Sequence, residues 1–354
     1  MTASPVPADL STPPGRVGAF REKLRTSESA FWRRGTLAAA ILPFVALGFA
    51  LIVLAIKGWP AIIVNGTGFF TNSSWNPGST YGATTYIHGV AVPQGASYGA
   101  WPLILGTIQS SFIALVLAVP IAIGAALALT ERLPRWIARP VTFTVELLAG
   151  IPSVLFGLWG IITLGPLLAK HVYPPIASVM PDVPVLRFFK APTGGGQGLL
   201  TSGIVLAIMI IPIIAATTIE LFRQVPALNQ DGAHALGMTD AEVTRSVTLP
   251  WVRRGIMGAS VLGLGRALGE TIALAMISGA ILGHTAVNIY SPMTTIAATI
   301  VSQLDSSFTD STGFATATLA EAALVLAVIS VAVNALARVI IHRSSSISAP
   351  VGRG

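Results

Sequence analysis

Arg266 and Glu270 carry charges that conflict with their surroundings. They lie in the stretch GLGRALGET, residues 263–271, inside a long run of apolar and small residues. Because they stand four apart, they are predicted to share one face of a helix and to touch. Neither is near an end of the run, so neither side chain reaches water easily. The arginine would offer a forked, permanently charged donor to an oxyanion, and the glutamate would neutralise it when no anion is bound.

The composition indicates a membrane protein. Of the 354 residues, 53% are hydrophobic and only 10% are charged, whereas soluble proteins carry roughly 25% charged residues. The formal net charge of +7 is interpreted as an excess of cytoplasmic basic residues, and no nucleic-acid partner is predicted. The sequence contains no cysteine, which excludes disulfides and thiolate sites, and its five histidines are scattered. We therefore predict no metal site.

Six apolar segments are each long enough to cross a hydrocarbon layer of roughly 30 Å. The predicted fold is an all-α integral membrane protein with about six transmembrane helices. The predicted spans are residues 36–56, 101–129, 141–169, 199–222, 252–282 and 313–341.

Residues 101–341 form the predicted core domain. The segments outside this core differ from it in composition. Residues 1–35 form a predicted N-terminal arm, partly disordered, that suits either an amphipathic helix on an anionic membrane surface or a solvated basic arm. Residues 57–100 are polar, Gly-rich and aromatic, and form a predicted loop that could meet a partner. Residues 342–354 form a predicted disordered tail.

The basic residues predict the orientation of the chain in the membrane. They are concentrated in every second connector, beginning with the N-terminal arm. Cytoplasmic connectors carry such an excess of lysine and arginine. Both termini are therefore predicted to be cytoplasmic and residues 57–100 extracytoplasmic. The connector 170–198, which has three basic residues, is the exception.

Residues 226–250, PALNQDGAHALGMTDAEVTRSVTLP, are predicted to form two short helices instead of a loop. Pro226 can open the first helix. Gly237 can end it, because glycine adopts the left-handed conformation without penalty. Thr239 and Glu242 have the spacing of a capping box that starts the second helix.

Leu249 and Pro250 are predicted to stop the second helix just before the next span. Leu236, Val243 and Val247 are available to pack or dock. A DNA-binding helix-turn-helix has similar punctuation but needs a polar recognition helix, which is missing here. A structural corner without a partner is the other alternative.

The spacing within this segment resembles the EAA loop of ABC importer permeases, where E-A-A, three residues, G, nine residues and I-x-L-P follow one another. The resemblance implies a coupling helix that docks in a groove of an ATP-binding subunit. Asp231 and Gly232 depart from the usual Glu and Ala, and the glycine loosens the helix by up to about 1 kcal/mol. The matching residues are Asp231, Gly232, Ala233, Gly237, Val247, Leu249 and Pro250.

Further stretches resemble the phosphate-specific branch of these permeases, the PstC type. They are ELLAGIPSVLFGLWG (146–160), LGLGRALGETIALAMISG (262–279), residues 98–124 and Trp75-Asn-Pro77. The related PstA type shares the Arg-x-x-Gly-Glu core but usually lacks a long loop after the first span.

The resemblance implies a type I (MetI-like) permease fold in a bacterial inner or plasma membrane, with phosphate as the substrate. It implies a second permease subunit of the PstA type, two ATP-binding subunits of the PstB type and an extracytoplasmic phosphate-binding protein of the PstS type. The chain has no G-x-x-x-x-G-K-[ST] motif, so we predict no ATPase site and no cofactor of its own, with ATP bound by the partner subunits.

The predicted substrate pathway centres on Arg266. If the fifth span enters the membrane near Gly255, Arg266 lies roughly 16 Å deep, at about 1.5 Å per residue. Glu270 could accept a hydrogen bond from a protonated phosphate, which would disfavour sulfate. Thr271 and Ser153 are candidate hydroxyl donors, although such hydroxyls often bond to their own backbone.

Two more acidic residues are predicted to belong to this pathway, each with an alternative role. Glu146 would satisfy the positive end of a helix dipole, pair with Arg266 or line an inner gate. Glu321 would extend the pair of Arg266 and Glu270 into a buried ion network that fixes helix packing, a purely structural alternative that the neighbouring glycines support equally.

Three other functions stay open at this point. The first is a permease for another oxyanion, sulfate or molybdate. The second is a proton-coupled secondary transporter with Glu270 and Glu321 as carriers, which leaves residues 226–250 unexplained. The third is a membrane scaffold or sensor that binds a partner through residues 57–100.

Overall fold

The computed structural model of the chain describes residues 16–79, 82–181, 183, 186–190 and 194–343. It divides into two compact units, residues 1–54 and 55–354, which are treated separately below. The predictions for residues 1–15 and for the tail from residue 344 fall outside the described residues.

Helix α1 (Arg16–Asn65) begins in the first unit and ends in the second. The part of the N-terminal arm from Arg16 on and the predicted span 36–56 belong to this one continuous helix. Residues 35–54 are apolar and mostly exposed in the isolated chain, as expected for side chains that face lipid.

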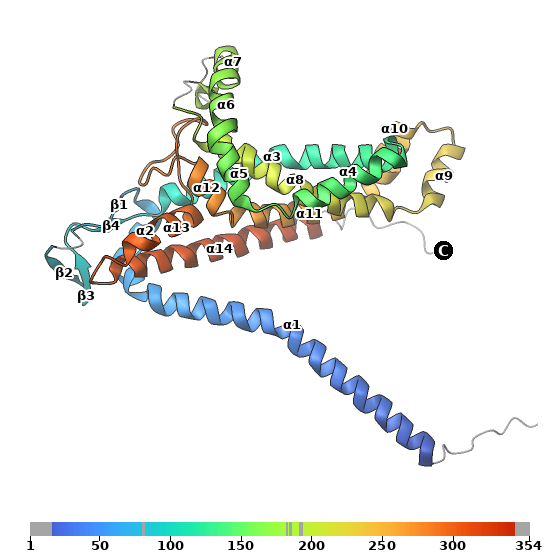
Figure 1. The fold of residues 1–354 in the computed structure, drawn as a ribbon, viewed down its shortest axis with the longest axis horizontal. Coiled ribbons are helices and arrows are strands. Elements are labelled where there is room, and N and C mark those ends of the chain that lie inside the picture. Colours follow the sequence, from blue (N-terminus) through green and yellow to red (C-terminus); the bar gives the residue numbers. More distant parts are fainter. Residues whose placement is uncertain (1–15, 80–81, 182, 184–185, 191–193, 344–354) are drawn as a thin grey trace, which may run out of the picture. The chain divides into compact units, whose positions relative to one another are not determined.

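Four long helices form the frame of the second unit (Figure 1): α3 (Trp101–Leu127), α8 (Leu199–Arg223), α11 (Leu249–Leu268) and α14 (Phe314–Arg343). Helix α8 is apolar on every side and largely buried, so it occupies the centre. The most extensive helix pair is α3 with α8. A stripe of small residues on α3, spaced four apart, allows this close approach: Ala114, Ala118, Ala122 and Ala126, all fully buried.

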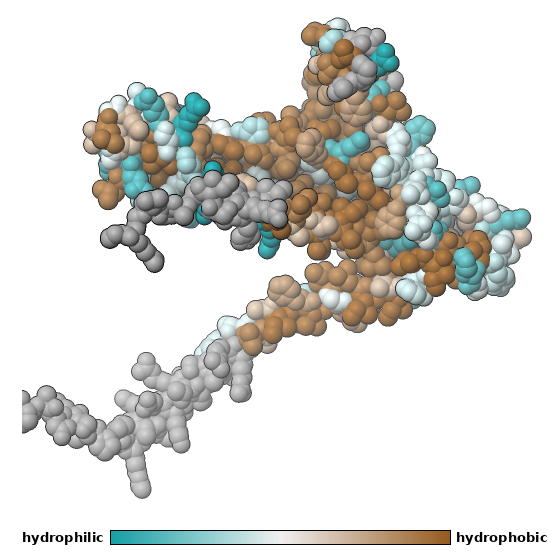
Figure 2. All heavy atoms as spheres, turned by 180° about the vertical axis from the view of Figure 1, so that it is seen from behind, coloured by the Kyte–Doolittle hydropathy of each residue, from teal (hydrophilic) through white to brown (hydrophobic). Residues whose placement is uncertain are grey.

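Five helical segments of the described chain are long and apolar enough to cross a membrane. In the second unit, apolar side chains gather over the middle of the helices and hydrophilic ones over its two ends (Figure 2). This distribution fits a body that is embedded in lipid and wetted at both ends.

The predicted third span, 141–169, is wrong as a single helix. Helix α4 (Arg135–Leu148) ends before a turn, and the membrane-crossing segment begins afresh at Ser153. Pro152 has an extended backbone, and a proline disfavours the helical conformation of the residue before it. The segments after it are α5 (Ser153–Trp159), the π-helix η2 (Gly160–Leu164), α6 (Gly165–His171) and α7 (Tyr173–Val179).

The predicted connector 283–312 contains a helix that the sequence analysis missed, α13 (Ile296–Ser307). The hydroxyl of Thr295 caps it by accepting from the amide of Ala298. Its first residues are buried against α12, α3 and α14. The remaining short helices are the π-helix η1 (Ala128–Arg132), the 3-10 helix η3 (Leu186–Phe189) and α12 (Ile272–Ile277).

The residues between Asn65 and α3 form local structure at the end of the unit opposite α9 and α10 (Figure 1). Trp75 and Tyr98 stack edge to face at 5.1 Å, and burial together with the charge of Asp310 raises the pKa of Tyr98 to about 12. The elements are α2 (Gly68–Thr71) and the antiparallel pairs β1 (Trp75–Asn76) with β4 (Ser97–Tyr98) and β2 (Thr84–Ile87) with β3 (Val90–Pro93).

Candidate functional site

The predicted pairing of Arg266 with Glu270 on one helix face is wrong. Helix α11 ends at Leu268, and α12 starts only at Ile272. The break turns Glu270 away from the i, i+4 position, and within the described residues its carboxylate forms no ion pair with Arg266. The predicted fifth span, 252–282, is therefore two helices.

Local hydrogen bonds explain the break. Oε1 of Glu270 accepts from the amide of Ala273 at 3.2 Å, in the first turn of α12. The hydroxyl of Thr271 donates to the carbonyl of Gly269 at 3.0 Å. Such side chains compete with the helix for backbone groups, and a glycine before them weakens it further. The run Gly269-Glu270-Thr271 was the signal that could have predicted this break.

Arg266 lines an open hollow of about 500 Å³. The guanidinium is exposed in the isolated chain, whereas Glu270 is buried. Two of the lining residues, Asn334 and Arg338, come from α14 and were not predicted as site residues. The hollow lies between α8, α11 and α14 and is lined by Ile213, Leu262, Gly265, Arg266, Asn334 and Arg338.

Three other predicted pathway residues are not among those that line this hollow. Glu146 lies in the last turn of α4 and is exposed, so its predicted place at the positive end of a helix dipole is wrong. Ser153 is the first residue of α5 and is half-buried. Thr271 is held in the break after α11.

Glu321 belongs to a different part of the bundle. It is buried, and its Oε2 accepts from Nδ2 of Asn65 at 2.8 Å. It borders an apolar hollow of about 450 Å³. Along α14 it lies about 20 Å from Asn334, at 1.5 Å per residue. The predicted extension of the Arg266 pair to Glu321 is therefore wrong.

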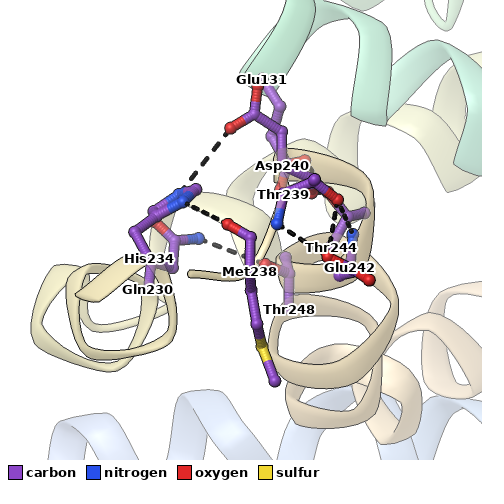
Figure 3. Close-up of polar contacts among 9 residues, drawn as sticks. All are labelled: Glu131, Gln230, His234, Met238, Thr239, Asp240, Glu242, Thr244 and Thr248. Atoms are coloured by element: carbon purple, nitrogen blue, oxygen red, sulfur yellow. Dashed lines mark hydrogen bonds and ion pairs between the residues drawn. The ribbon is translucent and has the colours of Figure 1, made fainter. Parts of the chain in front are cut away.

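Residues 226–250 form the predicted helical pair (Figure 3): α9 (Ala227–Ala235) and α10 (Asp240–Val243), which continues as the π-helix η4 (Thr244–Thr248). Gly237 has a φ of +83°, the left-handed conformation predicted for it. The capping box is complete, because Thr239 and Glu242 each bond to the other's backbone amide. We call residues 226–248 the coupling element.

Side-chain bonds close the coupling element on itself and on η1, as Figure 3 shows. Gln230 donates to the hydroxyl of Thr248 at 3.2 Å, which joins α9 to η4. The hydroxyl of Thr244 donates to Oε2 of Glu131 at 2.6 Å. Glu131 belongs to η1, so this bond ties the element to the end of α3.

Pro250 does not stop the second helix as predicted. The π-helical turn η4 leads directly into α11, and Pro250 is the second residue of α11. At this position the missing amide hydrogen costs little, since the first amides of a helix have no partner in it. The second helix of the coupling element, α10 with η4, is thus continuous with α11.

The residues that match the EAA pattern differ in how deeply they are buried. Asp231 and Gly232 are exposed, whereas Ala233 is buried with Val243. Two large apolar side chains of α9 and its C-terminus, Leu228 and Leu236, are 80% and 82% exposed. Val247 and Leu249 are half-buried. The outward face of the element is therefore apolar at two points.

Comparisons with known proteins identify relatives of this chain. Residues 118–346 match the family model of the binding-protein-dependent transport system inner membrane component. The chain is 58% identical to phosphate transport system permease protein PstC 1 of Mycobacterium bovis, over 89% of this chain and 93% of that one. It is 40% identical to the PstC permease of Mesorhizobium japonicum, over 89% and 90% of the two chains. A solved structure of the inward-facing MetNI methionine ABC transporter is similar at a TM-score of 0.44 and 17% identity, covering 69% and 94%.

Several helices long and apolar enough to cross a membrane, with a polar helical pair at one end, define a multi-pass membrane protein. The chain belongs to the binding-protein-dependent transport system inner membrane components, and within them to the PstC permeases.

Proposed function

We propose that this chain is the permease subunit through which an ATP-driven importer moves inorganic phosphate into the cell. Its relatives in the PstC group are phosphate transport system permeases. The observation that carries the proposal is the open hollow between α8, α11 and α14, which the permanent cation of Arg266 lines. Ionised side chains at such depth are functional by default.

The depth of the hollow supports a role in translocation. Ile213 lies about 15 Å from the Arg223 end of α8, and Asn334 about 14 Å from the Arg343 end of α14, at 1.5 Å per residue. Both values place the hollow near the middle of a hydrocarbon layer of roughly 30 Å. A guanidinium there binds a tetrahedral oxyanion through paired hydrogen bonds.

The coupling element supplies the link to ATP. We propose that Leu228 and Leu236 dock in a groove of an ATP-binding subunit of the PstB type. Because the element continues into α11, a push on it moves the helix that carries Arg266. ATP is bound by the partner subunits, and this chain holds no cofactor.

The remaining assignments follow from the family. A second permease of the PstA type would cover the open side of the hollow, and an extracytoplasmic phosphate-binding protein of the PstS type would dock near β1–β4. The chain would lie in the bacterial inner or plasma membrane with both termini in the cytoplasm. A proton-coupled transporter is less well supported, because Glu270 and Glu321 have different partners.

ATP-driven uptake of labelled phosphate in proteoliposomes tests the proposal. The vesicles contain this chain with its partner permease, ATP-binding subunits and binding protein, and excess sulfate is the competitor. We expect uptake that requires ATP and ignores sulfate. Uptake abolished by sulfate would sink the phosphate assignment, and no ATP-dependent uptake from an intact complex would sink the transport role.

A further inference from the structure

Asn334 and Arg338 on α14 face the same hollow as Arg266 on α11. They stand four apart, so their side chains project from one face of α14. The amide of Asn334 lies directly against α11, because a Cβ on Gly265 would be 3.7 Å from both its Oδ1 and its Nδ2. Gly265 precedes Arg266, so the small residue leaves room for the amide beside the guanidinium.

The three side chains have no partner within the protein as far as the structure describes it. Arg266, Asn334 and Arg338 each make no hydrogen bond and no ion pair with any described residue. Among the described residues, no carboxylate lines the hollow. Glu270 and Glu321 behave differently, because Glu270 accepts a hydrogen bond from the amide of Ala273 and Glu321 accepts one from Asn65.

This arrangement is electrostatically incomplete. Two guanidinium groups that share one hollow repel each other, and the repulsion is stronger where the surroundings are apolar than in water. An anion with two negative charges would remove the repulsion and fill the donors of both arginines. Asn334 differs from them, since its amide can both donate a hydrogen bond and accept one.

We propose that Asn334 and Arg338 complete, with Arg266, one oxyanion-binding site for the transported phosphate. This inference rests on the proposed function and adds the residues that hold the substrate. Arg338 lies about 6 Å nearer the cytoplasmic end of α14 than Asn334, at 1.5 Å per residue. It therefore attracts the anion from Arg266 toward the cytoplasm. The carbonyl of Asn334 accepts a hydrogen bond from the hydroxyl of a protonated phosphate, and sulfate has no such hydroxyl.

Charge rescue tests the role of Arg338. The sequence has no cysteine, so the Arg338→Cys variant carries the single thiol of this chain. In the assembled complex, with saturating phosphate-loaded binding protein, we expect uptake to fall about tenfold or more while ATP hydrolysis persists. A methanethiosulfonate that attaches an ethylammonium group should restore uptake. The reagent that attaches an ethylsulfonate group should not.

Two controls separate this result from a general need for cytoplasmic charge. The unmodified chain receives both reagents, which reveals any effect on thiols of the partner subunits. Arg135→Cys removes an exposed arginine at the start of α4, which does not line the hollow. We expect its uptake to stay within about twofold of the unmodified complex with either reagent.

Two variants of Asn334 distinguish a role in anion binding from a role in helix packing. Asn334→Asp keeps the shape of the side chain but places a negative charge beside the anion, whereas Asn334→Ala only removes the amide. An anion site requires the aspartate variant to transport less than the alanine variant. A packing role requires the reverse, because the isosteric aspartate preserves the contact with Gly265.

The outcomes distinguish a failure of the proposed anion site from a failure of the proposed phosphate import. If Arg338→Cys transports within about twofold of the unmodified complex, or both reagents restore it equally, the inference is overturned and the phosphate importer stands. The same holds if Asn334→Asp transports better than Asn334→Ala. If the unmodified complex takes up no phosphate, the proposed function fails and this inference fails with it.

Discussion

The hollow at Arg266 and the coupling element differ in whether their polar side chains are hydrogen-bonded within the protein. In the coupling element, Thr239 and Glu242 satisfy each other, and Gln230 is bonded to Thr248. In the hollow, the polar side chains of α11 and α14 have no partner among the described residues. The coupling element is hydrogen-bonded within itself and leaves two apolar leucines exposed, whereas the described side chains of the hollow include unpaired donors.

This difference indicates which structural property each region needs for its proposed function. A rigid part that transmits force gains from internal bonds, because local opening would absorb the push. A binding site gains from donors that are fixed in place but unpaired, since the ligand then meets them without breaking other bonds. Changes at unpaired donors should therefore alter transport, and changes at paired groups should alter local stability.

The largest expected effect is at Arg266. Arg266→Gln removes the charge but keeps a polar side chain, so the loss of charge-assisted hydrogen bonds should lower uptake roughly 10- to 100-fold, at about 1.5–3 kcal/mol. Phosphate uptake and ATP hydrolysis are measured in the same proteoliposomes. Arg266→Lys keeps the charge without the fork and should transport at an intermediate rate. Equal uptake by all three chains would mean that this arginine holds no substrate.

The second effect is expected at Leu236, which is 82% exposed although it is large and apolar. Leu236→Asp should weaken the assembly with the ATP-binding subunits by about tenfold or more, because burying a leucine contributes about 1.5–3 kcal/mol. Assembly is measured by titrating the purified permease pair with the ATP-binding subunit. Ala241→Asp, on the exposed part of α10, is the control. Equal weakening by both variants would count against docking through Leu236.

The coupling element was predicted from the sequence almost residue by residue. Its signals are local, because a left-handed glycine and a capping box each act within a few residues. One local rule failed at Pro250, where the π-helical turn η4 allows the helix to continue. The long apolar helices α3, α8 and α14 were also predicted, since their length and hydropathy are sufficient signals.

The site in the membrane was predicted only in part. Arg266 was identified because a charge in an apolar run is conspicuous. Its companions on α14 were missed, because the contact of Asn334 with Gly265 joins residues far apart in the sequence. The predicted partnership with Glu270 is wrong, because the run that contains Gly269 and Thr271 ends the helix even though the apolar sequence continues beyond it.

A pair of glycines gives the third prediction. Gly237 has a φ of +83°, so Gly237→Ala should destabilise the coupling element by about 1–2 kcal/mol. Gly232 lies within α9, and an added Cβ would meet nothing within 4 Å. Gly232→Ala should therefore stabilise α9 by about 0.5–1 kcal/mol. Hydrogen exchange of the amides in α9 measures both variants, and changes of the same sign would contradict this assignment.

The smallest effect concerns the capping box. Hydrogen bonds from the amide and hydroxyl of Thr239 lower the pKa of Glu242 below its ordinary value of 4.5. A lowered pKa means that the bonded carboxylate stabilises the fold above the unfolded value, and that this contribution is lost as the pH falls through the folded pKa. Glu242→Gln should thus exchange the amides of residues 240–248 faster than the unmodified chain at pH 7. The difference should begin to shrink as the pH falls below the unfolded value of about 4.5, and it should vanish below the folded pKa, where both side chains are neutral. Thr239→Ala, which removes the hydroxyl, should cost about 1 kcal/mol of helix stability.

Phosphate uptake should change little in either variant, because these groups are paired within the element and meet no ligand. A loss of uptake as large as that of Arg266→Gln would show that the coupling element tolerates no local opening.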